Sequence, residues 1–431
     1  VDSFARAYGI MMTQPFGPVY LCYDAGLQEK ALAAKPALTA AAGARVPTPV
    51  AAAPSALEEA ADLLVAAERP VLMAEYGGAR AFAAHVALAE TLGAGFVDVG
   101  SRLNFPSRHP LNLSLIDEAF AGVDVIAGLD VRDWERVTSR LDRTTRQTKS
   151  LVGEHCRWID IGFGDLEVSA WSMDYQRFRR ADLRILGDTA TAVPALTELC
   201  RERIARDPGA KRRVDAQREH VTALGAAARE RWAAKTREVW DDTPISLPRL
   251  ASELWTLIER EDWVLTSNTL RDWTRRIWDF DAPHRHPGKS LGTATQIGIS
   301  LGVALAHKGT DRLVVAIEPD GDLMFDPGAL WVAAKYELPI LIVMFNNRAY
   351  YNDWEHQLLM ARLRGTPEAR AHIGMDLHGP EPDFALLARS MGCVGIGPVL
   401  EPGDLHAALA EGIAQVKAGK PVVVDVVTAH R

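Results

Sequence analysis

The sequence comprises 431 residues, of which 48% are hydrophobic and 24% are charged. At about 100–200 residues per domain, this length predicts two or three domains with cores of ordinary size. Gly, Pro or charged residues interrupt the longest apolar runs well short of the ~18 residues that a membrane-spanning helix requires, so a soluble globular protein is expected and extensive disorder is excluded. The 48 Lys and Arg against 56 Asp and Glu give a net charge of −8. Without a long basic block, general nucleic-acid binding is not expected.

The four cysteines are widely separated and show no C-x-x-C spacing, which argues against a zinc site or a disulfide framework. They are Cys22, Cys156, Cys200 and Cys393. We therefore expect a reducing, cytoplasmic environment. The first residue is Val1 rather than Met, and the start lacks the basic and apolar regions of a secretory signal. We expect the chain to begin inside a longer protein.

Residues 1–31 have the pattern of the tail of a domain. A short helical pattern includes Phe4 and Ile10, and the alternation over Val19–Tyr23 predicts a strand. One helix and one strand are too few to enclose a core. Residues 32–56 then turn to Ala, Pro, Thr and Val, a composition typical of a linker that crosses a surface.

Residues 57–205 alternate helical and strand patterns and predict an α/β domain. Its strands are nearly continuous in apolar residues, which implies a parallel sheet covered by helices on both faces. Residues 206–245 are dense in Arg, Glu, Lys and Ala and predict a solvated helical linker. The helices expected in the domain are Leu57–Ala67, Ala81–Leu92, Ile116–Ala121 and Val193–Arg203. The expected strands are Val71–Ala74, Gly95–Val99, Asp124–Leu129, Arg157–Gly162 and Leu183–Leu186.

The same alternation resumes in residues 246–431, which predicts a second domain of this kind. The fold class is therefore α/β, with two doubly wound parallel-sheet domains preceded by the tail of a third. The helices expected here are Leu247–Glu259, Thr295–His307, Gly328–Tyr336, Asp383–Met391 and Pro402–Ala418. The expected strands are Trp263–Thr266, Leu313–Glu318, Ile340–Phe345 and Val422–Val427.

The most informative motif spans two consecutive strands of the second domain. Asp320-Gly321-Asp322 follows one apolar strand, and Asn346-Asn347 follows the next. In a right-handed βαβ unit the carboxyl ends of both strands meet at one edge of the sheet, so Asp320 and Asn347 are expected to come together there. A carboxylate and an amide oxygen are hard donors that suit Mg²⁺, with a backbone carbonyl, water and diphosphate oxygens completing the shell. Gly321 permits close approach of the backbone to such an anion.

An Asp-Gly pair after a strand is by itself an ordinary turn signal, but the whole set resembles the signature of thiamine diphosphate-dependent enzymes. The segments Gly288–Gly292 and Pro382–Gly392 agree with it. The chain is similar to the acetolactate synthase and 2-oxo acid decarboxylase type of that family. The resemblance implies that residues 1–31 end a pyrimidine-binding domain, that 57–205 form the central domain, and that 246–431 form the diphosphate-binding domain.

The resemblance also implies roles for individual residues. Asp320, the side chain of Asn347 and the carbonyl of Ala349 would be the protein ligands of Mg²⁺. Leu291 would support thiamine in its bent conformation, and the carbonyl of Lys289 would accept a hydrogen bond from the aminopyrimidine. The other cofactor-binding residues that it implies are Gly321, Asp322, Asn268 and Thr269.

The catalytic residues remain unassigned, and several side chains are candidates. Tyr350, Asp353 and His356 follow the metal-binding motif and would face the substrate if the helix there runs as in the family. His284-Arg-His286 belongs either to the site, because histidine titrates near neutrality, or to a solvated loop. Three indoles would line an apolar substrate pocket or belong to the core, namely Trp273, Trp278 and Trp354.

Three departures from the family pattern matter. Pro319 replaces the first Gly of Gly-Asp-Gly, which fixes φ and removes an N–H but keeps the metal-binding carboxylate of Asp320. Gly292-Thr-Ala-Thr-Gln296 replaces Gly-Tyr-Gly-Leu-Pro, so no substrate contact is carried over there. The glutamate that activates the coenzyme lies on the family's pyrimidine-binding domain, so no residue of this chain takes that role. We therefore expect the chain alone to bind coenzyme weakly and to catalyse nothing.

The function implied is that of a Mg²⁺- and thiamine diphosphate-dependent enzyme that cleaves or forms a C–C bond beside a carbonyl, most often by decarboxylating a 2-oxo acid. Alternatives are a lyase that acts on a 2-hydroxyacyl or diketone substrate without decarboxylation, and a catalytically silent coenzyme-binding module. Glu75-Tyr-Gly-Gly78 resembles a dinucleotide turn, which is weak evidence for a flavin. The implied partners are a pyrimidine-binding domain on a separate or cleaved chain and further copies in a homo-oligomer, without nucleic acid or membrane.

Overall fold

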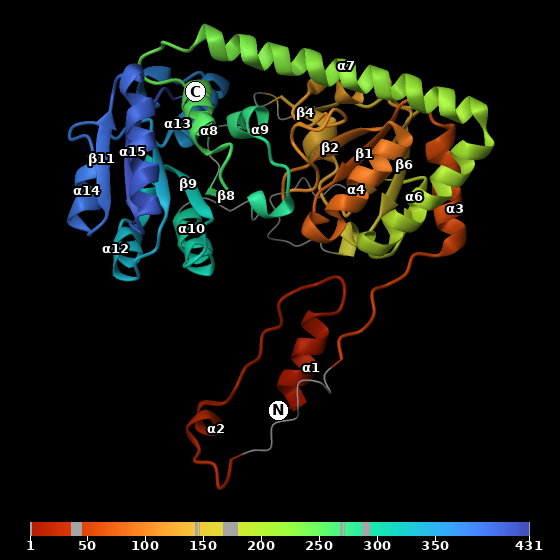
Figure 1. The fold of residues 1–431 in the computed structure, drawn as a ribbon, viewed down its shortest axis with the longest axis horizontal. Coiled ribbons are helices and arrows are strands. Elements are labelled where there is room, and N and C mark those ends of the chain that lie inside the picture. The colour runs from red at the N-terminus through yellow and green to blue at the C-terminus, as the bar shows by residue number, and fades with distance from the viewer. Residues whose placement is uncertain are drawn as a thin grey trace.

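The computed structural model describes residues 2–35, 45–142, 145, 147–166, 180–267, 270, 272–286 and 294–430. Within these residues the chain forms two five-stranded parallel sheets, each covered by helices, as Figure 1 shows. The expected fold class is thereby confirmed. Across these same ranges, no helix combines the length and the apolar character needed to cross a membrane.

The first sheet has the strand order β2-β1-β3-β6-β7. All of its neighbouring strands run parallel, and β1, β2 and β3 are buried along their whole length, as expected for a sheet with helices on both faces. Helix α6 packs against both α3 and α4. The strands are β1 (Pro70–Ala74), β2 (Gly95–Asp98), β3 (Val125–Leu129), β6 (Arg157–Ile161) and β7 (Leu183–Ile185). The helices are α3 (Pro54–Ala66), α4 (Gly78–Leu92) and α6 (Thr189–Arg206).

The second sheet has the order β11-β12-β10-β9-β8 and is also parallel throughout. Because side chains alternate along a strand, Val315 of β9 packs into one apolar cluster with α8 and α15, whereas its neighbour Val314 packs into another with α10 and α12. The strands are β8 (Trp263–Ser267), β9 (Leu313–Pro319), β10 (Leu341–Asn346), β11 (Val394–Val399) and β12 (Val422–Val427). The main helices are α8 (Leu247–Ile258), α10 (Thr295–Ala306), α12 (Gly328–Lys335), α14 (Phe384–Ser390) and α15 (Leu405–Lys417).

A helix of 31 residues, α7 (Pro208–Glu238), connects the two sheets and runs along the top of the molecule in Figure 1. The side chain of Asp207 caps its first turn by accepting from the N–H of Gly209. Most of its side chains are exposed or half-buried, so a largely solvated helix occupies the region predicted to be a helical linker. The units also touch directly, since the hydroxyl of Ser107 donates to the carbonyl of Trp278 at 2.8 Å.

The expected strand Val19–Tyr23 is wrong, because these residues lie in neither helix nor strand. No neighbouring strand pairs with them in the described ranges, and the side chain of Tyr20 is 89% exposed. The expected helical pattern is present as α1 (Asp2–Met11), followed by a short helix, α2 (Ala25–Glu29). Figure 1 shows both helices in red, standing away from the two sheets.

Several short elements differ from the expectation. The expected helix Ile116–Ala121 is a 3-10 turn over Asp117–Phe120. Strand β11 contains Gly395, Gly397 and Pro398, residue types that disfavour strands, and it is tolerated because it lies at the edge of the sheet. Further elements that the sequence did not predict are α5 (Glu135–Thr138), β4 (Ser139–Leu141), β5 (Thr148–Ser150), α9 (Trp273–Ile277) and α11 (Asp320–Phe325). Helix α13 (Tyr351–Arg364) lies where the family resemblance implies a helix.

Candidate functional site

The carboxyl ends of β9 and β10 bring the Asp320 and Asn347 side chains together. The two strands are parallel neighbours, with Pro319 opposite Phe345, so the residues that follow them meet at the same edge of the sheet. The backbone N–H of Ala349 donates to Asp320 Oδ2 at 3.2 Å and to Asn347 Oδ1 at 3.0 Å. The three residues expected to bind Mg²⁺ therefore form one hydrogen-bonded group.

The Asp320 carboxylate is almost completely buried, with 1% of its surface exposed. Burial raises its pKa to about 7, although the N–H groups of Gly321, Ala349 and Arg348 oppose this rise by hydrogen bonding. The N–H of Gly321 lies 2.8 Å from Oδ1. A carboxylate in such a site gains most from a cation that replaces the lost hydration.

The donor set at this edge fits Mg²⁺. It combines one carboxylate, one amide oxygen and the carbonyl of Ala349, all hard oxygen ligands. Two backbone hydrogen bonds, from Leu377 to Arg348 and from Tyr350 to Met375, fix the backbone on either side of Ala349 without using its carbonyl. Among the described residues no group of three His, Cys, Asp or Glu is placed to hold a metal.

Glycine suits position 321, because a Cβ there would lie 2.6 Å from the ring of Tyr350 and would force the ring to move. The Tyr350 ring in turn meets Phe325 at a centroid distance of 5.9 Å. Burial of the Tyr350 hydroxyl and the charge of Asp320 raise the tyrosine pKa. Tyr350 therefore borders the Asp320 group, as its place in the sequence suggests.

The other two candidates on the substrate side, Asp353 and His356, are exposed residues of α13. The structure does not bring them to Asp320, and they remain predictions. Asn268, Thr269, Lys289 and Leu291 lie outside the described residues.

A hydrogen-bonded network that sequence reasoning missed joins three elements beside Asp320. The hydroxyl of Ser267 at the end of β8 donates to Gln296 Oε1 at 2.7 Å. The amide of Gln296, in the first turn of α10, donates to Asp322 Oδ2 at 2.8 Å. Gln296 stands where the family's Gly-Tyr-Gly-Leu-Pro segment has its proline. This substitution therefore has a structural role in the present chain. Asp322, expected to bind cofactor, uses this oxygen to hold α10 against α11.

Glu318 is a second feature that the sequence did not reveal. Its side chain is fully buried, and neither carboxylate oxygen has a hydrogen-bond partner in the part of the chain that the structure describes. Burial, followed by the charge of Asp322, raises its pKa to about 8. The sequence around Glu318 did not indicate that its side chain is buried, because a single acidic residue in an apolar strand does not show which face of the sheet it occupies.

The histidines and tryptophans that were singled out are mostly structural. His286 Nδ1 lies 2.7 Å from the carbonyl of Leu265, and burial lowers the His286 pKa. His284 pairs with the exposed Asp262 at 3.7 Å. Trp278 is fully buried and belongs to the core, whereas Trp354 is half-buried beside His430, at a ring distance of 5.6 Å.

At the carboxyl edge of the first sheet, Glu75 occupies the turn that resembles a dinucleotide site. Its carboxylate is fully buried and accepts from the Ser101 hydroxyl at 2.8 Å and from the N–H groups of Arg132 and Asp133 at 2.8 and 3.0 Å. A phosphate would bind to such N–H groups. Because Glu75 already uses them, the turn offers no support for a flavin.

His85, beneath this turn, makes stability depend on pH. Its ring is fully buried, Nδ1 lies 3.1 Å from the carbonyl of Asn104, and Nε2 has no partner in the described residues. Burial lowers its pKa from 6.5 to about 4. Between these values the unfolded chain binds a proton that the folded chain does not, so the free energy of unfolding falls as pH falls through this window.

Between pH 7 and pH 4, the free energy of unfolding of the unmodified chain should fall by about 3 kcal/mol more than that of the His85→Gln variant. Gln keeps a donor for the Asn104 carbonyl but does not titrate. Urea unfolding at a series of pH values measures the free energy of unfolding of both proteins. The contributions of the other titrating groups are common to both and cancel in the difference. Parallel pH profiles would contradict the assignment.

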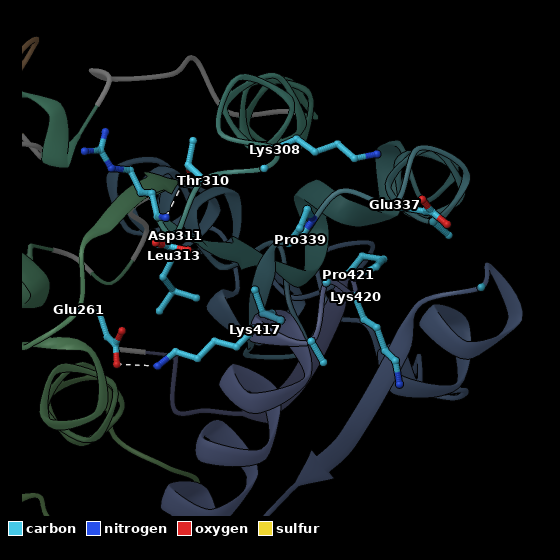
Figure 2. A pocket seen from close by; sticks show the side chains of 17 residues that line it. Glu261, Lys308, Thr310, Asp311, Leu313, Glu337, Pro339, Lys417, Lys420 and Pro421 are labelled. Atoms are coloured by element: carbon cyan, nitrogen blue, oxygen red, sulfur yellow. Dashed lines mark hydrogen bonds and ion pairs between the residues drawn. The ribbon is translucent and has the colours of Figure 1, made fainter.

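A hollow of about 990 Å³ lies at the opposite edge of the second sheet (Figure 2). Leu313 and Pro421, at the amino ends of β9 and β12, line it. Its lysines already have partners, since Lys417 donates to Glu261 at 2.7 Å and Lys308 donates to the carbonyl of Tyr336 at 2.6 Å. Open α/β sheets bind ligands at their carboxyl edge, so this hollow is not the functional site.

The fold and the site define a doubly wound α/β protein with a hard-oxygen site at the carboxyl edge of its second sheet. Residues 269–426 match the family described as "Thiamine pyrophosphate enzyme, C-terminal TPP binding domain". This part of the chain is therefore similar to the thiamine pyrophosphate-binding domain of these enzymes, and the resemblance found in the sequence is confirmed.

Similar proteins agree with this relationship. The acetolactate synthase isozyme 3 large subunit of Escherichia coli strain K12 is 26% identical over 390 residues, which cover 86% of this chain and 61% of that protein. The benzoylformate decarboxylase of Pseudomonas aeruginosa is 26% identical over 438 residues, covering 99% of this chain and 73% of that protein. The chain thus spans less than two thirds of the Escherichia coli relative.

A solved structure shows the same fold. The crystal structure of benzoylformate decarboxylase from Polynucleobacter necessarius aligns with a TM-score of 0.71 and 18% sequence identity. The alignment covers 100% of this chain and 73% of that one. It includes both sheets, although the family match in sequence is confined to the second.

Proposed function

We propose that this chain is the larger part of a Mg²⁺- and thiamine diphosphate-dependent enzyme that cleaves or forms a C–C bond next to a carbonyl, most often by decarboxylating a 2-oxo acid. The observation that carries the proposal is the convergence of Asp320 and Asn347 on the N–H of Ala349. This group has the oxygen donors that a diphosphate-bound Mg²⁺ requires.

The residues of the chain position the reactants. Asp320 supplies the only charge among the proposed protein ligands, and Asn347 and the carbonyl of Ala349 supply neutral oxygens. When bound, thiamine diphosphate supplies an electron sink for the carbanion formed beside the carbonyl. The absence of a side chain at Gly321 makes room for the ring of Tyr350, which packs against the start of α11.

The enzyme needs a pyrimidine-binding domain that supplies the glutamate for coenzyme activation. The exposed apolar side chains of residues 2–35 fit this proposal, because a further domain would cover them; they are Phe4, Ile10, Phe16, Tyr20, Tyr23 and Leu27. Among these, Phe16 already has the guanidinium of Arg80 over its ring, 5.1 Å from the centroid. A second exposed apolar group on α10, α11 and α12 fits a homo-oligomer, and it consists of Leu305, Phe325 and Trp331. A cytoplasmic location is part of the proposal, and the free thiols of the four cysteines suit a reducing compartment.

Calorimetric titration of the chain with thiamine diphosphate tests the proposal. Binding should require Mg²⁺ and disappear when the ion is chelated, because the metal links the diphosphate to Asp320. Equal binding with and without Mg²⁺, or no binding at high coenzyme concentration, would contradict the proposed function. Thiamine monophosphate is the control ligand and should bind more weakly, since it offers the metal fewer oxygens.

A further inference from the structure

The loop that carries the metal ligands has a conformation that its own sequence does not favour. In this metal loop, residues 346–350, Arg348 stands between Asn347 and Ala349 with a φ of 57°. The left-handed region disfavours any residue with a Cβ unless neighbouring structure stabilises it. The orientation of the Asn347 amide and of the Ala349 carbonyl depends on this backbone. Something outside the loop must therefore hold it.

A segment that returns to the loop after α13 provides the backbone support. In this return segment, residues 375–384, the N–H of Leu377 donates to the carbonyl of Arg348 at 2.8 Å. The carbonyl of Met375 accepts from the N–H of Tyr350 at 2.7 Å. Ala349 and Asp376 form an antiparallel bridge between these two bonds. The backbone is thus fixed on both sides of the Ala349 ligand.

Side chains join the same two segments at the surface. Arg348 Nη2 lies 2.8 Å from Glu381 Oε2, and the other oxygen of Glu381 lies 3.1 Å from His378 Nδ1. The guanidinium is 26% exposed and the carboxylate 44% exposed. This ion pair acts directly on the residue with the disfavoured backbone.

A buried link lies at the far end of the return segment. The N–H of Phe384 donates to Asp425 Oδ2 at 3.2 Å, and Asp425 Oδ1 accepts from the Asn346 amide at 2.9 Å. Asp425 is fully buried, so this link belongs to the core of the fold. Removing the ion pair therefore leaves the return segment anchored and changes the metal loop alone.

We propose that the Arg348–Glu381 ion pair sets the geometry of the Mg²⁺ ligands, which makes Glu381 a positioning residue. The inference rests on the proposed function, because it concerns the same metal site. Without Glu381, Arg348 gains freedom to leave the left-handed region, and the Asn347 amide and Ala349 carbonyl rotate away from the geometry the ion requires. Partly exposed ion pairs are individually weak, so the expected loss of metal affinity is ~2–5-fold.

Titration with Mn²⁺ followed by electron paramagnetic resonance, at a fixed concentration of thiamine diphosphate, measures this affinity. Glu381→Gln should bind Mn²⁺ ~2–5-fold more weakly. The double variant Arg348→Glu with Glu381→Arg restores an ion pair of reversed polarity and should recover most of the affinity. Thermal unfolding of these proteins should be unchanged, since the pair lies at the surface.

Glu368→Gln is the matched control. Glu368 pairs with Arg362 at 2.9 Å, and its side chain is 46% exposed, close to the 44% of Glu381. The control removes the same charge from a pair that does not touch the metal loop, so Mn²⁺ affinity should not change. Equal affinity in the chain with Glu381→Gln and in the control would overturn the proposal, as would failure of the reversed pair to recover binding. If the unmodified chain binds no Mn²⁺, the proposed function itself fails.

Amide hydrogen exchange gives a readout that needs no metal. The N–H of Ala349 is bonded to Asp320 and Asn347, so exchange over residues 346–352 reports how firmly the metal loop is held. Exchange in this segment should accelerate in Glu381→Gln and stay unchanged in Glu368→Gln. Unchanged exchange in both variants would show that the ion pair does not hold the loop.

Discussion

Replacement of Asp320 by alanine is expected to abolish Mg²⁺-dependent binding of thiamine diphosphate. Asp320 is the only charged group among the proposed protein ligands. Outer-shell partners of metal ligands alone change metal affinity by about 10–100-fold, so loss of the charged ligand should cost more than ~100-fold. Calorimetric titration with coenzyme in the presence of Mg²⁺ measures the loss.

Two further variants separate metal binding from folding. Asp320→Asn keeps an oxygen acceptor for one of the two N–H groups, that of Gly321 or that of Ala349, so it should disturb the fold less than Asp320→Ala and still bind coenzyme far more weakly. Asn347→Ala should weaken binding less, because a neutral ligand is lost rather than a charge. Asp326→Ala, at the exposed end of α11, is the control and should bind as the unmodified chain does. Tight binding by Asp320→Asn would refute the metal assignment.

The part of the site that could be predicted from the sequence is the part that topology determines. A right-handed crossover between parallel strands forces their carboxyl ends to one edge, so the spacing of Asp320 and Asn347 was enough to place them together. The structure adds a detail that spacing cannot supply, namely that both oxygens accept from the N–H of Ala349.

The contacts that were missed depend on side chains from distant parts of the chain. Ser267, Gln296 and Asp322 belong to β8, α10 and α11, and their hydrogen bonds require the relative placement of all three elements. Likewise, the link between Arg348 and Glu381 spans helix α13 and the turn after it. No local pattern in the sequence reports such pairs.

The errors in the fold have a similar cause. The alternation over Val19–Tyr23 is that of a strand, but a strand forms only where a partner offers hydrogen bonds, and none lies beside it in the described chain. Conversely, β11 forms despite Gly395, Gly397 and Pro398, because β12 pairs with it along one side. Tertiary contacts decided both cases against the local signal.

Replacement of Trp278 by alanine should lower the free energy of unfolding by about 3–5 kcal/mol. Its indole is fully buried and contacts Trp263 and Phe280, with ring centroids 5.4 and 6.1 Å away. The indole N–H also donates to the carbonyl of Ala251 at 2.8 Å. Alanine would leave a large cavity beneath α8 that its neighbours fill only in part. Urea unfolding at pH 7 measures the change.

The same variant decides between the two interpretations of this indole. If Trp278 belongs to the core, Trp278→Ala should bind thiamine diphosphate and Mg²⁺ normally at temperatures where it remains folded, and Trp278→Phe should recover part of the stability. Leu386→Ala, at an exposed position on α14, is the control and should change stability by no more than about 0.5 kcal/mol. A Trp278→Ala variant as stable as the unmodified chain would instead show that the indole contributes nothing to the core, against the burial seen here.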